Sequence, residues 1–87
     1  MKVIVVYDIK EKRVSKVLKI CRKYFTWIQN SVFEGEITAS KLEKFKIEIN
    51  GTIKKDEDSV IIYVFPNDWY SKREIIGIKK GGEELIL

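Results

Sequence analysis

The run of β-prone apolar residues from Val3 to Tyr7 is the sequence feature that most restricts the fold. A run without polar interruptions is typical of a central strand that is covered on both faces. From Lys10 to Phe25 the apolar residues recur at three- and four-residue spacing, which predicts an amphipathic helix.

The outer face of this predicted helix is basic. At 100° per residue, the side away from the apolar face carries four lysines: Lys12, Lys16, Lys19 and Lys23. Residues 10–24 contain seven basic residues and one acid, whereas the whole chain has a net charge of +4. A solvated helix face and a nucleic-acid contact both explain this charge, and both interpretations stay open. Arg13 and Arg22 add guanidinium groups that suit phosphate, although many surface arginines bind no ligand.

Four further segments have strand-like composition: Thr26–Glu36, Ser59–Phe65, Arg73–Lys79 and Leu85–Leu87. The first is interrupted by Gln29-Asn30-Ser31, which indicates an irregularity in the middle of one strand. The last is short and apolar at the end of the chain. We expect it to pair with its own sheet or with the sheet of a partner.

A second helix is predicted before Asn50-Gly51, a pair typical of a helix C-terminus. Ser40 has the spacing of a capping box, and Thr38 is a rival cap. The apolar positions 45, 47 and 49 also alternate as in a strand. Segment length and the cap favour the helix.

These elements predict one α+β domain over residues 1–87, a ferredoxin-like βαββαβ sandwich with an extra short C-terminal strand. Residues 1–80 form the expected core, and residues 81–87 form a turn and the short strand. Two helices cover only one sheet face, and so small a domain is marginally stable alone. Because Cys21 is the only cysteine, no intrachain disulfide compensates. We therefore expect a homodimer packed through the sheet faces.

The chain contains no histidine, which excludes imidazole-based nucleophilic catalysis and histidine-ligated zinc. Catalysis would have to use carboxylates, hydroxyls, lysines or a hard metal ion. The N-terminal apolar run is far shorter than the roughly 20 residues of a membrane span and too short for a signal-peptide core. We expect a cytoplasmic protein with no membrane contact.

Asp8 is the first candidate for chemistry, because it follows the predicted central strand where the basic helix begins. The alternative is purely structural: Asp8 is the helix N-cap, with Glu11 three residues later. The segment Ser31–Gly35 is the second candidate; its Phe33 belongs in the core or in a dimer interface. Some aromatic residues are able to stack on bases, although packing is commoner: Trp27, Tyr63, Trp69 and Tyr70.

Three segments together resemble the CRISPR-associated protein 2 family: Val6–Ile9, Ile28–Gly35 and Asp58–Tyr63. The resemblance extends over essentially the whole chain, and the Gln-x-Ser-Val-Phe-Glu-Gly stretch is its most specific part. It implies a ferredoxin-like homodimer in which the C-terminal strand completes the partner's sheet. The family works in spacer acquisition beside the CRISPR integrase, so integrase subunits and DNA or RNA are the implied partners.

The resemblance also gives Asp8 a catalytic role, as a ligand of Mg²⁺ or another hard divalent ion at the dimer two-fold. One carboxylate from each chain would suit the sparse carboxylate-plus-water sites of magnesium. Tyr7, Ser31 and Phe33 would lie near this site. The implied function is CRISPR adaptation with endonuclease activity on RNA or DNA. A non-catalytic DNA-binding adaptor and a toxin-type messenger-RNA endoribonuclease are the alternatives.

Overall fold

The computed structural model describes residues 1–67 and 70–78. Its elements are β1 (Lys2–Asp8), α1 (Glu11–Tyr24), β2 (Thr26–Gln29), β3 (Val32–Glu36), α2 (Ala39–Asn50), β4 (Ser59–Asn67) and β5 (Tyr70–Gly77). The order is therefore βαββαβ followed by β5, which confirms the predicted α+β fold class. The predicted strand Leu85–Leu87 and the end of Arg73–Lys79 lie outside the described residues.

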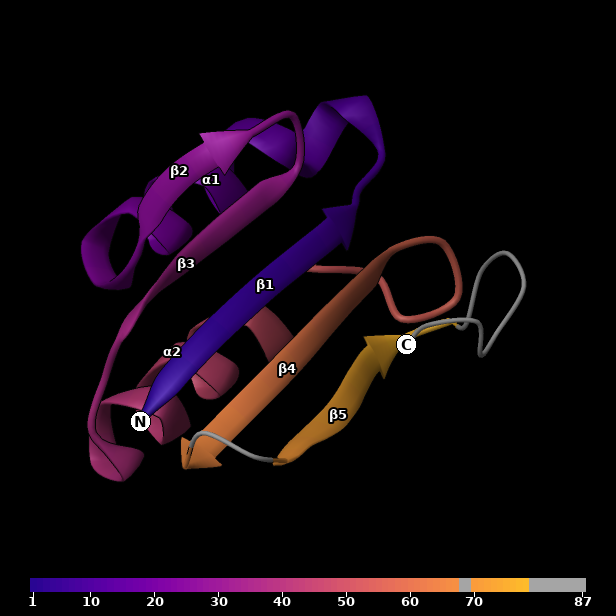
Figure 1. Ribbon diagram of the computed structural model, residues 1–87. Helices are drawn as coiled ribbons and strands as arrows, with labels where there is room; N and C mark the ends of the chain where they lie inside the picture. The colour runs from indigo at the N-terminus through magenta and orange to yellow at the C-terminus, as the bar shows by residue number, and fades with distance from the viewer. Residues whose placement is uncertain (68–69, 79–87) are drawn as a thin grey trace.

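The five strands form one antiparallel sheet in the order β2-β3-β1-β4-β5. Central strand β1 places Val5 between Phe33 of β3 and Ile62 of β4. All three side chains are fully buried beneath the helices. Figure 1 shows α1 and α2 lying together on this face of the sheet. The first strand is thus central, as its apolar run predicts.

The segment predicted as one irregular strand is a hairpin of two strands, which corrects that prediction. The chain turns at Asn30 and Ser31, and Asn30 has a positive φ of 41°. Asparagine tolerates this left-handed conformation better than most residues, so it permits a tight reversal here. The register also shifts between Trp27 and Gln29.

The second helix forms as predicted, and Thr38 is its cap. The Thr38 hydroxyl oxygen accepts a hydrogen bond from the backbone N–H of Lys41 at 3.2 Å. Phe45 is fully buried and packs edge-on against Phe25, with ring centroids 5.0 Å apart. Ile47 is 70% exposed, which a helical period explains and an alternating strand in this position does not. Neither helix of the described chain is long and apolar enough to cross a membrane.

The opposite face of the sheet is covered by no helix of the described residues (Figure 1). Strand register places seven half-buried apolar or aromatic side chains there: Ile4, Val6, Val32, Ile61, Tyr63, Phe65 and Ile75. Such a face on a small domain is typical of a surface that packs against another protein. The predicted dimer would use this face.

Candidate functional site

Asp8 lies at the C-terminal end of β1, opposite Ser59 of β4. Its side chain is exposed, and strand alternation puts it on the uncovered face with Ile4 and Val6. The neighbouring Tyr7 N–H donates to the backbone carbonyl of Ser31 at 3.1 Å. The backbones of Tyr7, Asp8 and Ser31 therefore lie at one end of the sheet.

Asp8 is not the N-cap of α1, which corrects the structural alternative. The helix begins at Glu11, its N-cap is Lys10, and no side chain at the cap position makes the capping bond. Asp8 is still part of β1, so the helix starts beyond it. The backbone N–H of Lys10 instead donates to Asp58 Oδ1 at 2.9 Å. A residue distant in sequence thus takes the place of a local cap.

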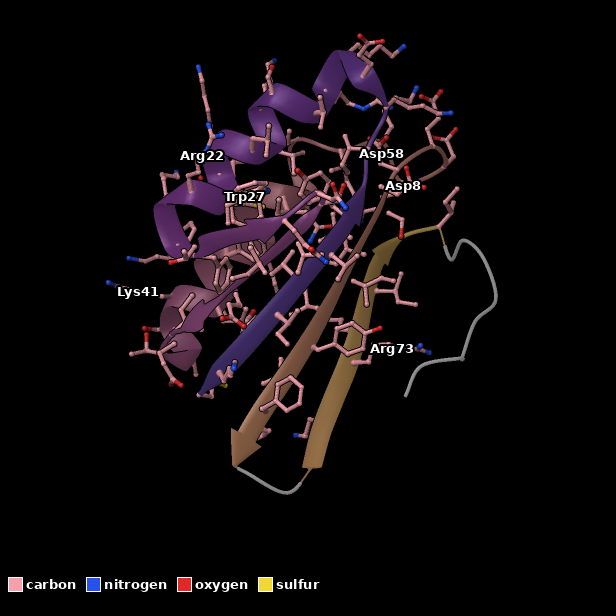
Figure 2. All side chains as sticks on the ribbon, turned by 45° about the horizontal axis from the view of Figure 1, so that its top comes forward. Asp8, Arg22, Trp27, Lys41, Asp58 and Arg73 are labelled. Atoms are coloured by element: carbon pink, nitrogen blue, oxygen red, sulfur yellow. The ribbon has the colours of Figure 1, made fainter. Side chains whose placement is uncertain are left out.

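Asp58 is a fully buried carboxylate that organises this end of the molecule (Figure 2). Its Oδ2 lies 2.6 Å from Arg13 Nε, and its Oδ1 lies 3.1 Å from Arg13 Nη2. Asp58 Oδ2 also accepts the backbone N–H of Lys54 at 2.9 Å. The hydrogen bonds from Arg13 are the main reason that the pKa of Asp58 lies well below its usual value. The carboxylate is therefore ionised and neutralised by Arg13 in the folded protein.

Arg13 has a different environment from the other basic residues of α1. Its Nη2 also lies 2.8 Å from Glu57 Oε1, and its side chain is only 12% exposed. Hydrogen bonds to Asp58, and then to Glu57, raise the pKa of Arg13. The sequence suggests Arg13 as a phosphate-binding residue, but its guanidinium binds these two carboxylates. Arg13 is therefore not part of the proposed nucleic-acid surface.

Sequence reasoning missed this group of residues, because Arg13 and Asp58 are 45 positions apart. The only local signal is an acidic pair, Glu57-Asp58, directly before an apolar strand. Nothing in one sequence says which of the six basic residues of α1 such a pair binds.

Tyr7 and Phe33 lie on the helix-covered face rather than beside the exposed Asp8 carboxylate. Tyr7 is 8% exposed and Phe33 is fully buried, with ring centroids 6.2 Å apart. Of the two places left open for Phe33, the structure has it in the core. Burial raises the pKa of Tyr7, while a hydrogen bond with Ser31 and the nearby charge of Arg22 act in the opposite direction.

The exposed basic face of α1 is formed as predicted, by five residues that we call the α1 basic face: Lys12, Lys16, Lys19, Arg22 and Lys23. One member is already paired within the protein. Lys23 forms a hydrogen-bonded ion pair with Glu48 of α2, and the hydrogen bond raises the pKa of Lys23. The remaining four are the stronger candidates for binding phosphate.

A magnesium site must be judged on the oxygen ligands present. Among residues 1–67 and 70–78, no three acidic, cysteine or histidine side chains form a metal-binding group. The nearby Asp58 is buried and neutralised by Arg13, whereas the carboxylate of Asp8 is exposed at the end of β1. Magnesium is often held by one or two carboxylates and several waters, so Asp8 from two chains fits this ion.

Comparison with known proteins shows the family of the chain. Residues 1–73 match the family model described as CRISPR associated protein Cas2. A protein of Dictyoglomus turgidum named CRISPR-associated endoribonuclease Cas2 is 53% identical over the full length of both chains. A protein of the same name from Thermotoga maritima is 49% identical over 99% of each chain.

Solved structures give the same result. A structure titled as a crystal structure of cas2 is 40% identical, with a TM-score of 0.74 over 100% of this chain and 98% of the other. Streptococcus pyogenes Cas2 is 32% identical, with a TM-score of 0.70 over 79% of this chain and 90% of the other. The chain therefore belongs to the CRISPR associated protein Cas2 family.

Proposed function

We propose that this chain acts in CRISPR adaptation as a nucleic-acid-binding homodimer beside the CRISPR integrase. In this proposal Asp8 from each chain holds a magnesium ion that supports phosphodiester hydrolysis. The observation that carries the proposal is the position of Asp8, an exposed carboxylate at the edge of an uncovered apolar sheet face. The names of the relatives, CRISPR-associated endoribonucleases, support the same function class.

Dimer formation matters for the chemistry because one chain offers too few ligands. A two-fold interface contains the same surface patch from both subunits. A dimer packed through the uncovered face therefore includes two Asp8 carboxylates in one interface. When bound, magnesium polarises a phosphodiester and lowers the pKa of a water nucleophile.

Residues of the chain would bind the metal ion, bind the nucleic acid and position the site. Asp8 supplies the charged oxygen ligand, and the α1 basic face attracts the phosphate backbone without reading bases. Asp58 binds the backbone of Lys10, two residues after Asp8, and thereby fixes the segment that leaves the site. A fixed segment keeps the carboxylate in one position relative to bound phosphate.

A second candidate function is a purely architectural DNA-binding adaptor. One observation favours it: the exposed α1 basic face suits the phosphate backbone of DNA and needs no metal ion to bind it. Electrostatic binding through the α1 basic face would then be the whole activity of the protein on DNA.

The deciding experiment compares cleavage of labelled RNA and DNA by wild type and Asp8→Asn at equal dimer fraction. Because Asp8 does not cap α1, we expect the Asn variant to stay folded and to keep its nucleic-acid affinity. Magnesium-dependent cleavage should disappear in Asp8→Asn and in wild type with chelator. Asp56→Asn, which removes the same charge from an exposed turn, is the matched control and should cleave normally.

Cleavage that survives Asp8→Asn would show that Asp8 is not the ligand. Cleavage that persists in chelator would exclude magnesium-dependent hydrolysis. If wild type binds DNA but cleaves neither substrate under any condition, the architectural adaptor is the correct function.

A further inference from the structure

Trp27 is the most unusual exposed side chain of the described residues. It lies in β2, the edge strand of the sheet, and is 56% exposed. Tryptophan is large and apolar, and it is seldom left in solvent without a use. The neighbouring Ile28 of the same strand is 44% exposed.

The Trp27 side chain is held in place although it is exposed. Its indole Nε1 donates a hydrogen bond to the backbone carbonyl of Asn30 at 3.0 Å. That carbonyl belongs to the turn between β2 and β3, so the ring is fixed to the hairpin from which it projects. A ring held in this way loses little conformational entropy when a flat ligand binds to it.

The helix that contacts the strand of Trp27 carries exposed basic residues. A single residue, Phe25, separates the end of α1 from β2, and the two elements are in contact. Arg22 is an exposed residue in the last turn of α1, five positions before Trp27 (both are labelled in Figure 2). The charge of Arg22 also acts on Tyr7, whose hydroxyl is hydrogen-bonded to Ser31 beside this same hairpin turn. Lys19 lies one helical turn before Lys23 and is exposed on the same helix.

A fixed aromatic ring together with cationic side chains is typical of a site that binds single-stranded nucleic acid. Aromatic side chains stack on unpaired bases while basic groups follow the phosphate backbone. A duplex does not offer this contact, because its base faces are already stacked within the helix. An acidic protein would satisfy the charges but has no particular need of a flat ring.

We propose that Trp27 is a stacking platform for an unpaired nucleobase, with Arg22 and Lys19 binding the adjoining phosphates. This inference rests on the proposed nucleic-acid function and adds to it one residue that contacts a base. It gives the hairpin turn at Asn30 a role in recognition, since the turn carbonyl orients the indole.

The test uses full-length protein with the substitution Trp69→Phe, in which Trp27 is the only tryptophan. Three ligands are titrated: an oligothymidylate of about 12 nucleotides, an abasic strand of equal length, and a blunt duplex. The oligothymidylate should quench Trp27 fluorescence. Trp27→Ala should lower oligothymidylate affinity by about 5- to 150-fold, equivalent to about 1–3 kcal/mol for one stacked base. Trp27→Phe should retain part of this affinity.

Affinity for the abasic strand and for the duplex should be unchanged in Trp27→Ala, and so should the salt dependence of binding. Ile47→Ala removes another highly exposed apolar side chain and should leave all three affinities unchanged. An unchanged oligothymidylate affinity in Trp27→Ala would overturn the inference and point to a protein ligand at this edge. If Trp27→Ala lost the same affinity for the abasic strand as for the oligothymidylate, that result would also overturn the inference. Duplex binding without any effect of Trp27 would leave the proposed function intact, whereas no binding of any ligand would overturn both.

Discussion

Asp58 Oδ2 lies 2.6 Å from Arg13 Nε, which joins the turn before β4 to the first turn of α1. The carboxylate is fully buried, and it also accepts backbone N–H groups from Lys10 and Lys54. Two segments of the chain, residues 10–13 and 54–58, are therefore joined through one side chain. Asp8 stands at the end of β1, two residues before Lys10, so the same carboxylate stabilises the surroundings of the proposed metal ligand.

Asp58→Ala should destabilise the protein strongly. The substitution leaves Arg13 without its closest carboxylate and two part-buried backbone donors without an acceptor. Breaking a buried ion pair by removing one partner costs about 3–5 kcal/mol. Denaturant unfolding measured by circular dichroism checks this value. The matched variant is Glu57→Gln, which removes the charge of the more exposed partner of Arg13 and should cost much less. Equal losses of stability in the two variants would contradict the central role of Asp58.

Stability should fall as the solution becomes acidic. The folded-state pKa of Asp58 is lowered, chiefly by Arg13, so the unfolded chain binds a proton more readily than the folded chain. The stabilisation is present above the unfolded pKa of about 4 and is lost as the pH falls toward the folded value. Glu48 and Glu57 have lowered pKa values and act in the same direction. Denaturant unfolding between pH 7 and pH 2 measures this, and Asp58→Asn should flatten the profile in its acidic part.

DNA binding should depend on salt through the α1 basic face. Replacing Lys12, Lys16 and Lys19 with alanine should lower the slope of log K against log salt by about 0.9 for each duplex phosphate that the variant no longer neutralises. Lys23→Ala should lower this slope less than replacement of any one of those three lysines, because Glu48 already neutralises part of the charge of Lys23. The control variant replaces three exposed lysines elsewhere: Lys41, Lys44 and Lys55. If the control lowers the slope instead, another surface binds DNA.

The uncovered sheet face should mediate the homodimer. Ile61→Lys places a charge among half-buried apolar side chains of β1, β4 and β5, where a packed interface would have to desolvate it. We expect light scattering of micromolar wild type to give a dimer mass, twice that of the 10.2 kDa chain, and of the variant to give a monomer mass. The control is Ile47→Lys, on the exposed side of α2, which should stay dimeric. A monomer mass for wild type would contradict this prediction.

The sequence by itself determined those features that depend on local periodicity. The apolar run Val3–Tyr7 predicts a central strand, and helical spacing predicts both the buried and the basic face of α1. Asp8 could be placed at the end of its strand for the same reason. Each of these features depends on residues within a few positions of one another.

Tertiary structure decided the rest. The hairpin at Asn30 depends on the positive φ of that residue. The strand-forming residues on either side do not indicate this conformation. Arg13, rather than another basic residue of α1, pairs with Asp58, and Asp58 replaces a local helix cap. Both features depend on two segments that lie 45 residues apart in the sequence. The exposure of Trp27 depends on β2 being the edge strand. Secondary-structure propensity and hydrophobic periodicity depend on residues that are close in sequence. Burial and ion pairing depend on distant segments, because they form only when those segments pack together and exclude water.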